Sequence, residues 1–304
     1  MPERVKSGRR TVEISNPDKL MFPDDGITKR QLIDYYRTVA GVMLPQIKGH
    51  LLTMERFPNG IDGKRFYQKD MSDYFPDWLD RMTVPKQGGG EVTHVVASEP
   101  ATLVYLANQA CLTLHMSLSR KDRIDYPDQM IFDLDPSTDD FDGIRRTALD
   151  LKEVLDDLGL YSVVKTTGSR GLHVTIPLSR KDAFKDVRSF ARALAAHFAE
   201  HFPDRLTIEA RKEKRRDRIF VDWMRNSKGA TAVAPYSVRA RPGAPVAMPI
   251  SWDEVRSRRL RPGGYTMQDV ARIIATREDP WTGWRRKARS LKEATRRLER
   301  LVVR

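Results

Sequence analysis

The chain has 304 residues, 40% of them hydrophobic, which is enough for one large domain or two modest ones with a packed core. Its 54 Lys and Arg residues outnumber its 41 Asp and Glu residues, and the resulting net charge of +13 favours polyanionic partners. A single cysteine, Cys111, excludes an intramolecular disulfide and a cysteine-rich zinc site, and the lack of a long apolar run or apolar leader excludes a membrane span and a secretory signal.

The first element that the sequence predicts with a clear start is a helix that begins near Thr28. Thr28 and Gln31 have the spacing of a capping box, and apolar residues then recur at helical intervals from Leu32 to Met43. Further on, the segment KQGGGEV at 86–92 predicts a hairpin-like turn or surface loop.

From Met130 onward, strand-like and helical stretches alternate. The pattern predicts strands at 130–135, 161–166, 172–177 and 218–223, and helices at 141–158 and about 185–201. Gly159 marks the end of the first of these helices, and the strand at 172–177 is expected to form a hairpin with its predecessor. This order predicts an α/β or α+β fold with a mixed sheet flanked by helices.

Three aspartates stand at the ends of short apolar runs. Asp133 and Asp135 in FDLDPS are two residues apart on one strand, so their side chains share a face, and Asp222 ends the run IFVD. Carboxylates that face one point repel each other unless a divalent cation or a proton lies between them. Such oxygen ligands suit Mg²⁺ or Mn²⁺, and three carboxylates can hold two ions for phosphoryl or nucleotidyl transfer.

A glycine-bearing turn, TTGSRGLH, follows the acid pair after one helix and one strand. Gly168 and Gly171 allow close backbone approach, Ser169 offers a hydroxyl, and Arg170 offers a planar cation for phosphate oxygens. His173 lies on the polar side of the next strand. Because the spacing G-x-x-x-x-G-K-[ST] is absent, the turn predicts a phosphate-binding loop of another kind than the P-loop.

These motifs, together with the run IFVDWMRNSKGATAVAPYSVRARPGAPVAMPISWDEV, resemble the primase-polymerase domain of bacterial ligase D, in the archaeo-eukaryotic primase superfamily. NPDKLMFPDDGITKRQLIDYY and RFPNGIDGKRFYQK resemble the family's N-terminal part, so the resemblance covers nearly the whole chain. It implies a primase-like core with mixed sheets in a single domain, 1–304. The implied parts are a DNA-end-binding part at about 10–90, a catalytic core at about 91–275 and a basic C-terminal helix at about 280–304.

The resemblance also implies roles for individual residues. It makes three acids the catalytic ligands of two Mn²⁺ or Mg²⁺ ions: Asp133, Asp135 and Asp222. It assigns the incoming nucleotide to Ser169, Arg170, Gly171, His173, His115 and Arg239. It assigns a DNA 5′-phosphate to Lys19 and Lys29, and template stacking to Phe66 and Tyr67.

The implied function is that of a DNA-dependent nucleotidyltransferase, a primase-polymerase that extends primers and fills gaps at DNA breaks in non-homologous end joining, with a preference for ribonucleotides. The implied partners are gapped or broken DNA, NTPs or dNTPs, Ku and a separately encoded ATP-dependent DNA ligase, and the expected location is the cytoplasm, at the nucleoid and not at a membrane. Glu55 and Ala230 depart from the family pattern, because a lysine is expected at both positions, with Lys228 two residues before the second.

Two alternatives stay open at this point. FDLDPST mimics the strand-end Asp-x-Asp-x-Thr motif of haloacid dehalogenase-type phosphatases, although those enzymes usually carry it near the N-terminus. A non-catalytic DNA-end-binding protein would explain the basic clusters at 211–218 and 256–264 and the stacking aromatics, but it would not need three convergent acids.

Overall fold

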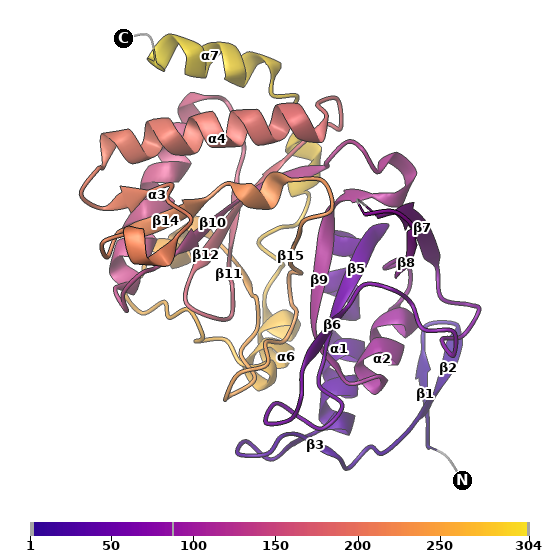
Figure 1. Cartoon of the computed structure of the whole chain (residues 1–304). Helices are drawn as coiled ribbons and strands as arrows, with labels where there is room; N and C mark the ends of the chain where they lie inside the picture. Colours follow the sequence, from indigo (N-terminus) through magenta and orange to yellow (C-terminus); the bar gives the residue numbers. More distant parts are fainter. Residues whose placement is uncertain (1–2, 87, 303–304) are drawn as a thin grey trace. The chain divides into compact units, whose positions relative to one another are not determined.

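The computed structural model describes residues 3–86 and 88–302 and divides into two compact units, each assembled from separate stretches of the chain (Figure 1). Unit 1 contains residues 3–122, 231–247 and 265–278. Unit 2 contains residues 123–230, 248–264 and 279–302. The expected partition into an end-binding part, a core and a C-terminal helix stays a prediction.

Unit 1 is built on an antiparallel sheet with the strand order β15-β9-β5-β6. Its strands are β15 (Thr231–Val233), β9 (Cys111–Arg120), β5 (His50–Arg56) and β6 (Phe66–Gln68). Shorter antiparallel pairs join β1 (Glu3–Ser7) to β2 (Arg10–Ile14), β3 (Leu20–Phe22) to β4 (Ile27–Thr28), and β7 (Arg81–Pro85) to β8 (Glu91–Val95). Helix α1 (Lys29–Ile47) contacts both α2 (Pro100–Asn108) and α6 (Met267–Thr276).

Helix α1 begins where the capping box predicts. The Thr28 hydroxyl accepts from the backbone N–H of Gln31, and the Gln31 side chain accepts from the backbone N–H of Thr28. Leu32, Val39 and Met43 are fully buried on one face, so the predicted helix is confirmed. The predicted turn at 86–92 lies between β7 and β8, and residue 87 falls outside the described residues.

Unit 2 contains a mixed sheet with the strand order β13-β14-β10-β12-β11-β16, in which only the β13–β14 pair of the described chain is parallel. Its strands are β13 (Leu206–Thr207), β14 (Ile219–Asp222), β10 (Gln129–Asp135), β12 (Leu172–Pro177), β11 (Val163–Thr166) and β16 (Pro249–Ile250). Helices α3 (Phe141–Asp157) and α4 (Phe184–His201) both contact the sheet. The predicted combination of mixed sheet and flanking helices is present.

Shorter elements complete unit 2. Helix α5 (Trp252–Arg256) contacts α3, and α7 (Lys292–Val302) lies alongside α4 (Figure 1). The short 3₁₀ helices are η2 (Lys212–Lys214), η3 (Met224–Asn226) and η4 (Trp284–Lys287), while η1 (Lys121–Arg123) stands where the chain passes from one unit to the other.

The strand predicted at 161–166 starts two residues late, at Val163. The Tyr161 side chain is 43% exposed, and the Ser162 carbonyl accepts a hydrogen bond from the Trp252 indole at 3.0 Å. This carbonyl therefore bonds to a side chain instead of a neighbouring strand. The helix predicted before it ends as expected, because Gly159 has a left-handed φ of 75° directly after the helix cap.

Two expectations from composition can be compared with the described residues. In that part of the chain, no helix combines the length and apolar character that crossing a bilayer requires. Cys111 is free and fully buried, as its apolar neighbours predict.

Candidate active site

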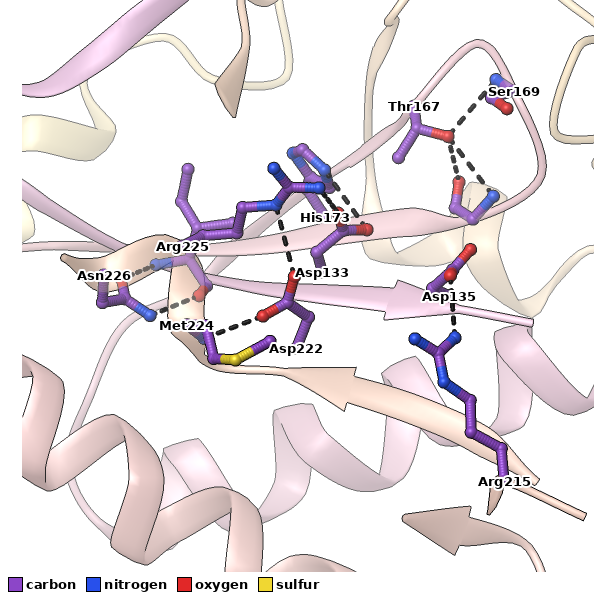
Figure 2. A network of polar contacts seen from close by, with 12 residues as sticks. Asp133, Asp135, Thr167, Ser169, His173, Arg215, Asp222, Met224, Arg225 and Asn226 are labelled. Atoms are coloured by element: carbon purple, nitrogen blue, oxygen red, sulfur yellow. Dashed lines mark hydrogen bonds and ion pairs between the residues drawn. The ribbon is translucent and has the colours of Figure 1, made fainter. Parts of the chain in front are cut away.

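Polar side chains stand in register across four neighbouring strands of unit 2. Asp133 on β10 is the direct partner of His173 on β12 and of Asp222 on β14, and His173 is in turn the partner of Lys165 on β11. Directly opposite residues on adjacent strands project from the same face of a sheet. Lys165, His173, Asp133 and Asp222 therefore form one row, which we call the polar row. Figure 2 shows its last three members converging.

The two facing carboxylates of the polar row each have one oxygen anchored by the fold. Asp133 Oδ1 lies 3.4 Å from Nε2 of the buried His173, and Asp222 Oδ1 accepts a 2.8 Å hydrogen bond from the Met224 backbone N–H. Their remaining oxygens face a single guanidinium (Figure 2). Asp133 Oδ2 lies 3.5 Å from Arg225 and Asp222 Oδ2 lies 3.3 Å from it, so Arg225 bridges the pair.

Burial and charge determine the ionisation of the polar row. Burial alone would raise the pKa of Asp133, but His173, Arg225 and Lys165 hold that pKa well below its usual range. Burial and then the Lys165 charge lower the pKa of His173 to about 4, so its imidazole is neutral at pH 7. Burial, followed by the charge of Asp133, raises the pKa of Asp222. A carboxyl group whose ionised form is disfavoured by a negative neighbour is stabilised when a cation lies beside it.

Asp135, the third predicted acid, stands outside this bridge. It is opposite Phe220 in the strand register, its side chain is 45% exposed, and its Oδ2 lies 3.1 Å from the Arg215 guanidinium. Arg215 is buried and stacks over the Phe220 ring at 4.2 Å. Within the described residues, no group of three His, Cys, Asp or Glu side chains is gathered as a metal site. The structure thus pairs two of the three acids and places the third beside an arginine.

The turn after β11 approaches β10 so closely that only glycine fits at position 171. A Cβ on Gly171 would lie 2.2 Å from the backbone oxygen of Leu134, the residue between the two acids of β10. The Thr167 hydroxyl accepts from the backbone N–H groups of Ser169 and Gly171 and so shapes the turn from within (Figure 2). Ser169 and Arg170 stay partly exposed on this turn, beside the acid-bearing end of β10.

The sequence interpretation missed the basic residues of this site. Lys165 is 1% exposed, yet it lies in a run, VVKT, that reads as an ordinary buried strand. Arg215 was one of several basic residues in the cluster at 211–218, and Arg225 was one position in a long family motif. Strand alternation places Lys165 on the His173 face once the hairpin register is known, so the register is the signal that could have found it.

In unit 1, a second polar cluster surrounds Glu55. Its carboxylate is 5% exposed and lies 3.7 Å from His115 Nε2 and 3.5 Å from the Arg65 guanidinium. The Tyr67 ring packs edge-on against His115, with centroids 5.8 Å apart. Burial would raise the pKa of Glu55, but His115, Arg239 and Tyr67 lower it overall. The predicted nucleotide residues of unit 1 therefore gather around the very residue that departs from the family pattern.

We expect Glu55→Gln to destabilise the protein at pH 7 by about 1–3 kcal/mol, because it removes the charge from a buried hydrogen-bond acceptor. The pKa of Glu55 is lower in the folded protein than the ordinary value of 4.5, so its stabilising effect is present above pH 4.5 and disappears as the pH falls through the folded pKa. Urea unfolding at a series of pH values should show the variant's deficit shrinking in acid. The exposed Glu91→Gln is the control. If the stability lost in Glu55→Gln did not change with pH, the charge of Glu55 would not be its cause.

A cavity of about 150 Å³ in unit 1 is lined by both predicted 5′-phosphate lysines and by Arg56. The Lys29 backbone N–H donates to the Lys19 carbonyl at 2.8 Å, which brings the start of α1 against the preceding turn. Lys29 is only 4% exposed, and its Nζ donates to Ser15 Oγ at 3.2 Å and to the Asn108 carbonyl at 3.3 Å. Burial and then the Lys19 charge lower the pKa of Lys29, and an anion here would counteract this shift by favouring the charged ammonium group.

The predicted stacking residues, Phe66 and Tyr67, lie on the edge strand β6. Their side chains are 38% and 56% exposed. Successive strand residues point to opposite faces, so the two rings present separate surfaces. The Arg56 guanidinium lies 5.5 Å from the Phe66 ring centroid, whereas Tyr67 contacts His115.

Comparisons with known proteins agree with one another. The family model described as "LigD, primase-polymerase domain" matches residues 28–281. The chain is 33% identical to the multifunctional non-homologous end joining protein LigD of Mycolicibacterium smegmatis and 32% identical to the bifunctional LigD of Bacillus subtilis. These alignments cover 82% and 85% of this chain but 33% and 42% of the relatives, so the chain spans a third to two fifths of their length.

A solved structure also matches most of the chain. The polymerase domain of Mycobacterium tuberculosis ligase D, determined in complex with DNA, is similar with a TM-score of 0.85 and 31% sequence identity. The match covers 91% of this chain and 99% of that one. The expected fold and the expected family resemblance are both confirmed.

Proposed function

Because the chain belongs to the LigD primase-polymerase domain family, we propose that it is a DNA-dependent nucleotidyltransferase that extends primers and fills gaps at DNA breaks. The observation that carries this proposal is the cross-strand pair of Asp133 and Asp222, with His173 in the same row. Facing carboxylates beside a turn suited to phosphate are the arrangement that nucleotidyl transfer requires. Family membership leaves the phosphatase alternative without support.

The proposed cofactors are two divalent cations, Mn²⁺ or Mg²⁺. The residues present fit such ions, because Asp133 and Asp222 turn oxygens toward one point, and because burial and then the Asp133 charge raise the pKa of Asp222. Asp135, on the same strand face as Asp133 and partly exposed, would complete the ligand set. When bound, divalent ions polarise phosphoryl oxygens and offset the charge that develops during transfer.

The chain's own residues would bind and orient the nucleotide. Ser169 and Arg170 are proposed to hold the triphosphate, with Gly171 keeping their turn close to β10. Among the described residues, the buried His173 Nδ1 has no hydrogen-bond partner, which favours a contact to the substrate. The assignment of His115 and Arg239 to the nucleotide rests on the family resemblance.

We expect Arg170→Ala to raise the apparent KM for nucleotide about tenfold or more, because a charge-assisted hydrogen bond contributes roughly 1.5–3 kcal/mol. The turnover number should change less, since the acids of the polar row are untouched. Steady-state primer extension measures both constants, and Arg146→Ala on the exposed side of α3 is the control. A lower turnover number at unchanged KM would place Arg170 outside the nucleotide site.

The remaining details follow the family. We propose a preference for ribonucleotides, a role in non-homologous end joining with Ku and an ATP-dependent DNA ligase, and a location in the cytoplasm at the nucleoid. The end-joining role is supported by the names of relatives that are longer than this chain. The nucleotide preference and the protein partners rest on the family resemblance.

Extension of a labelled gapped duplex tests the function directly. The duplex carries a 5′-phosphate at the gap, and the reactions combine rNTPs or dNTPs with Mn²⁺ or Mg²⁺. We expect extension, strongest with ribonucleotides and Mn²⁺. Tight binding of the duplex without extension under any of these conditions would favour the non-catalytic DNA-end-binding alternative.

A further inference from the structure

We propose that Arg225 is a positioning residue that holds Asp133 and Asp222 together before a divalent cation binds and gives way to that cation. The inference rests on the proposed function, because it takes these two carboxylates as metal ligands. It concerns a residue for which the sequence interpretation found no role.

The geometry separates fixed contacts from exchangeable ones. One oxygen of each carboxylate is anchored, Asp133 Oδ1 by the buried His173 and Asp222 Oδ1 by a backbone N–H. The other oxygen of each, Oδ2, is held by Arg225. The two Oδ2 atoms are therefore the positions that a new ligand partner can take without disturbing the anchored side.

Arg225 is loosely held compared with its neighbours. Its side chain is 48% exposed, whereas those of His173 and Asp222 are 4% and 11% exposed. Its distances to the two carboxylates, 3.5 and 3.3 Å, are close to the 3.4 Å between Asp133 and His173, so exposure and not distance distinguishes Arg225 from the buried partner. Among the described residues, these two ion pairs are the ones that its guanidinium forms. Because the side chain is half in solvent, it can leave without opening the core.

A guanidinium and a metal ion compete for these atoms. A bridging cation is favourable in either state, because Asp133 and Asp222 stand directly opposite each other on neighbouring strands and two carboxylates at that separation repel. A divalent cation bound to the two Oδ2 atoms would lie within a few ångströms of the guanidinium, and two cations at that separation repel each other. We therefore expect binding of the ion to displace Arg225 from both Oδ2 atoms.

Isothermal titration of Mn²⁺ into the nucleotide-free and DNA-free protein tests this exchange without relying on activity. Arg225→Gln should bind Mn²⁺ about three- to tenfold more tightly than the wild type, the range for losing two competing, partly exposed ion pairs. Arg256→Gln removes the same charge from an exposed ion pair with Asp253 and should leave the affinity unchanged. Arg225→Lys, which keeps the charge but cannot bridge with a planar fork, should lie between the wild type and Arg225→Gln.

Thermal unfolding provides a second measurement on the same proteins. Without metal, Arg225→Gln should unfold at a lower temperature than the wild type, because Asp133 and Asp222 then repel each other. Saturating Mn²⁺ should raise its melting temperature by more than it raises that of the wild type. If Arg225→Gln proves poorly folded, Arg225→Lys retains the charge and carries both measurements.

The outcomes separate this inference from the proposed function. Equal Mn²⁺ affinity of the wild type and Arg225→Gln, with the affinity lost in Asp222→Asn, would leave the metal site standing and overturn the exchange. Equal affinity of the wild type and Arg225→Lys would assign the effect to charge alone and overturn the bridge. Unchanged Mn²⁺ binding in Asp222→Asn would overturn the metal site and, with it, both proposals.

Discussion

Asp133→Asn should abolish primer extension, with a loss of at least about a thousandfold, equivalent to about 4 kcal/mol of transition-state stabilisation. Asp133 is the centre of the polar row, since it is the direct partner of both His173 and Asp222. Asparagine keeps the size of the side chain and one carbonyl oxygen, but it removes the charge that a divalent cation would neutralise. Single-turnover extension of a gapped duplex at saturating nucleotide gives the extension rate constant of each protein. The ratio of the two rate constants is the loss.

Two controls make this result specific. Asp253→Asn removes a similar charge from an exposed ion pair of unit 2 and should leave extension unchanged. Binding of the gapped duplex, measured by fluorescence anisotropy, should be equal in the wild type and Asp133→Asn, because the predicted 5′-phosphate lysines lie in unit 1. Residual extension within tenfold of the wild type would rule out Asp133 as a metal ligand.

The local pattern of the sequence was sufficient for the elements that carry the site. The capping box at Thr28 gave the start of α1 correctly, and period-two alternation placed Asp133 on the polar face of its strand. Both features depend on residues that are near one another in the chain. The close approach predicted at Gly171 was to a phosphate, whereas the structure places the backbone of β10 there.

The sequence pattern could not predict the register between neighbouring strands of the sheet. Alternation says which face a side chain takes, but not which residue stands opposite on the next strand. Asp133 and Asp222 are 89 positions apart in the sequence, and only the strand order β14-β10-β12 makes both Asp222 and His173 neighbours of Asp133. The bridging contacts of Arg225 and the ion pair of Arg215 with Asp135 depend on the same pairing.

Only the structure shows which residues surround Glu55, where the chain departs from the family pattern. From the sequence, it was only a glutamate at a position where the family pattern has a lysine. In the folded chain its carboxylate is buried among His115, Arg65 and Tyr67 on the unit 1 sheet, and its pKa is lowered there. A lysine at this position would face the same cations, so the substitution is matched to its surroundings.

Lys19→Ala combined with Lys29→Met should erase a preference for DNA that carries a 5′-phosphate at the gap. We expect the wild type to bind such a duplex about tenfold or more tightly than the same duplex with a 5′-hydroxyl, because hydrogen bonds from a cation to phosphate contribute roughly 1.5–3 kcal/mol. Both lysines line one cavity, and the first turn of α1 adds favourable potential for an anion. Methionine at position 29 preserves the buried stem while removing the ammonium group.

Competition anisotropy with the two duplexes over a range of salt concentrations separates this site from general electrostatic attraction. A terminal phosphate carries more negative charge than an internal phosphodiester, so a two-lysine cavity should distinguish the two ends, whereas a diffuse basic surface binds both alike. Lys48→Ala, an exposed lysine at the other end of α1, should lower the affinity for both duplexes equally or not at all. If the wild type binds the two duplexes equally at every salt concentration, Lys19 and Lys29 do not form a 5′-phosphate site, and the basic segment at 211–218 becomes the next region to mutate.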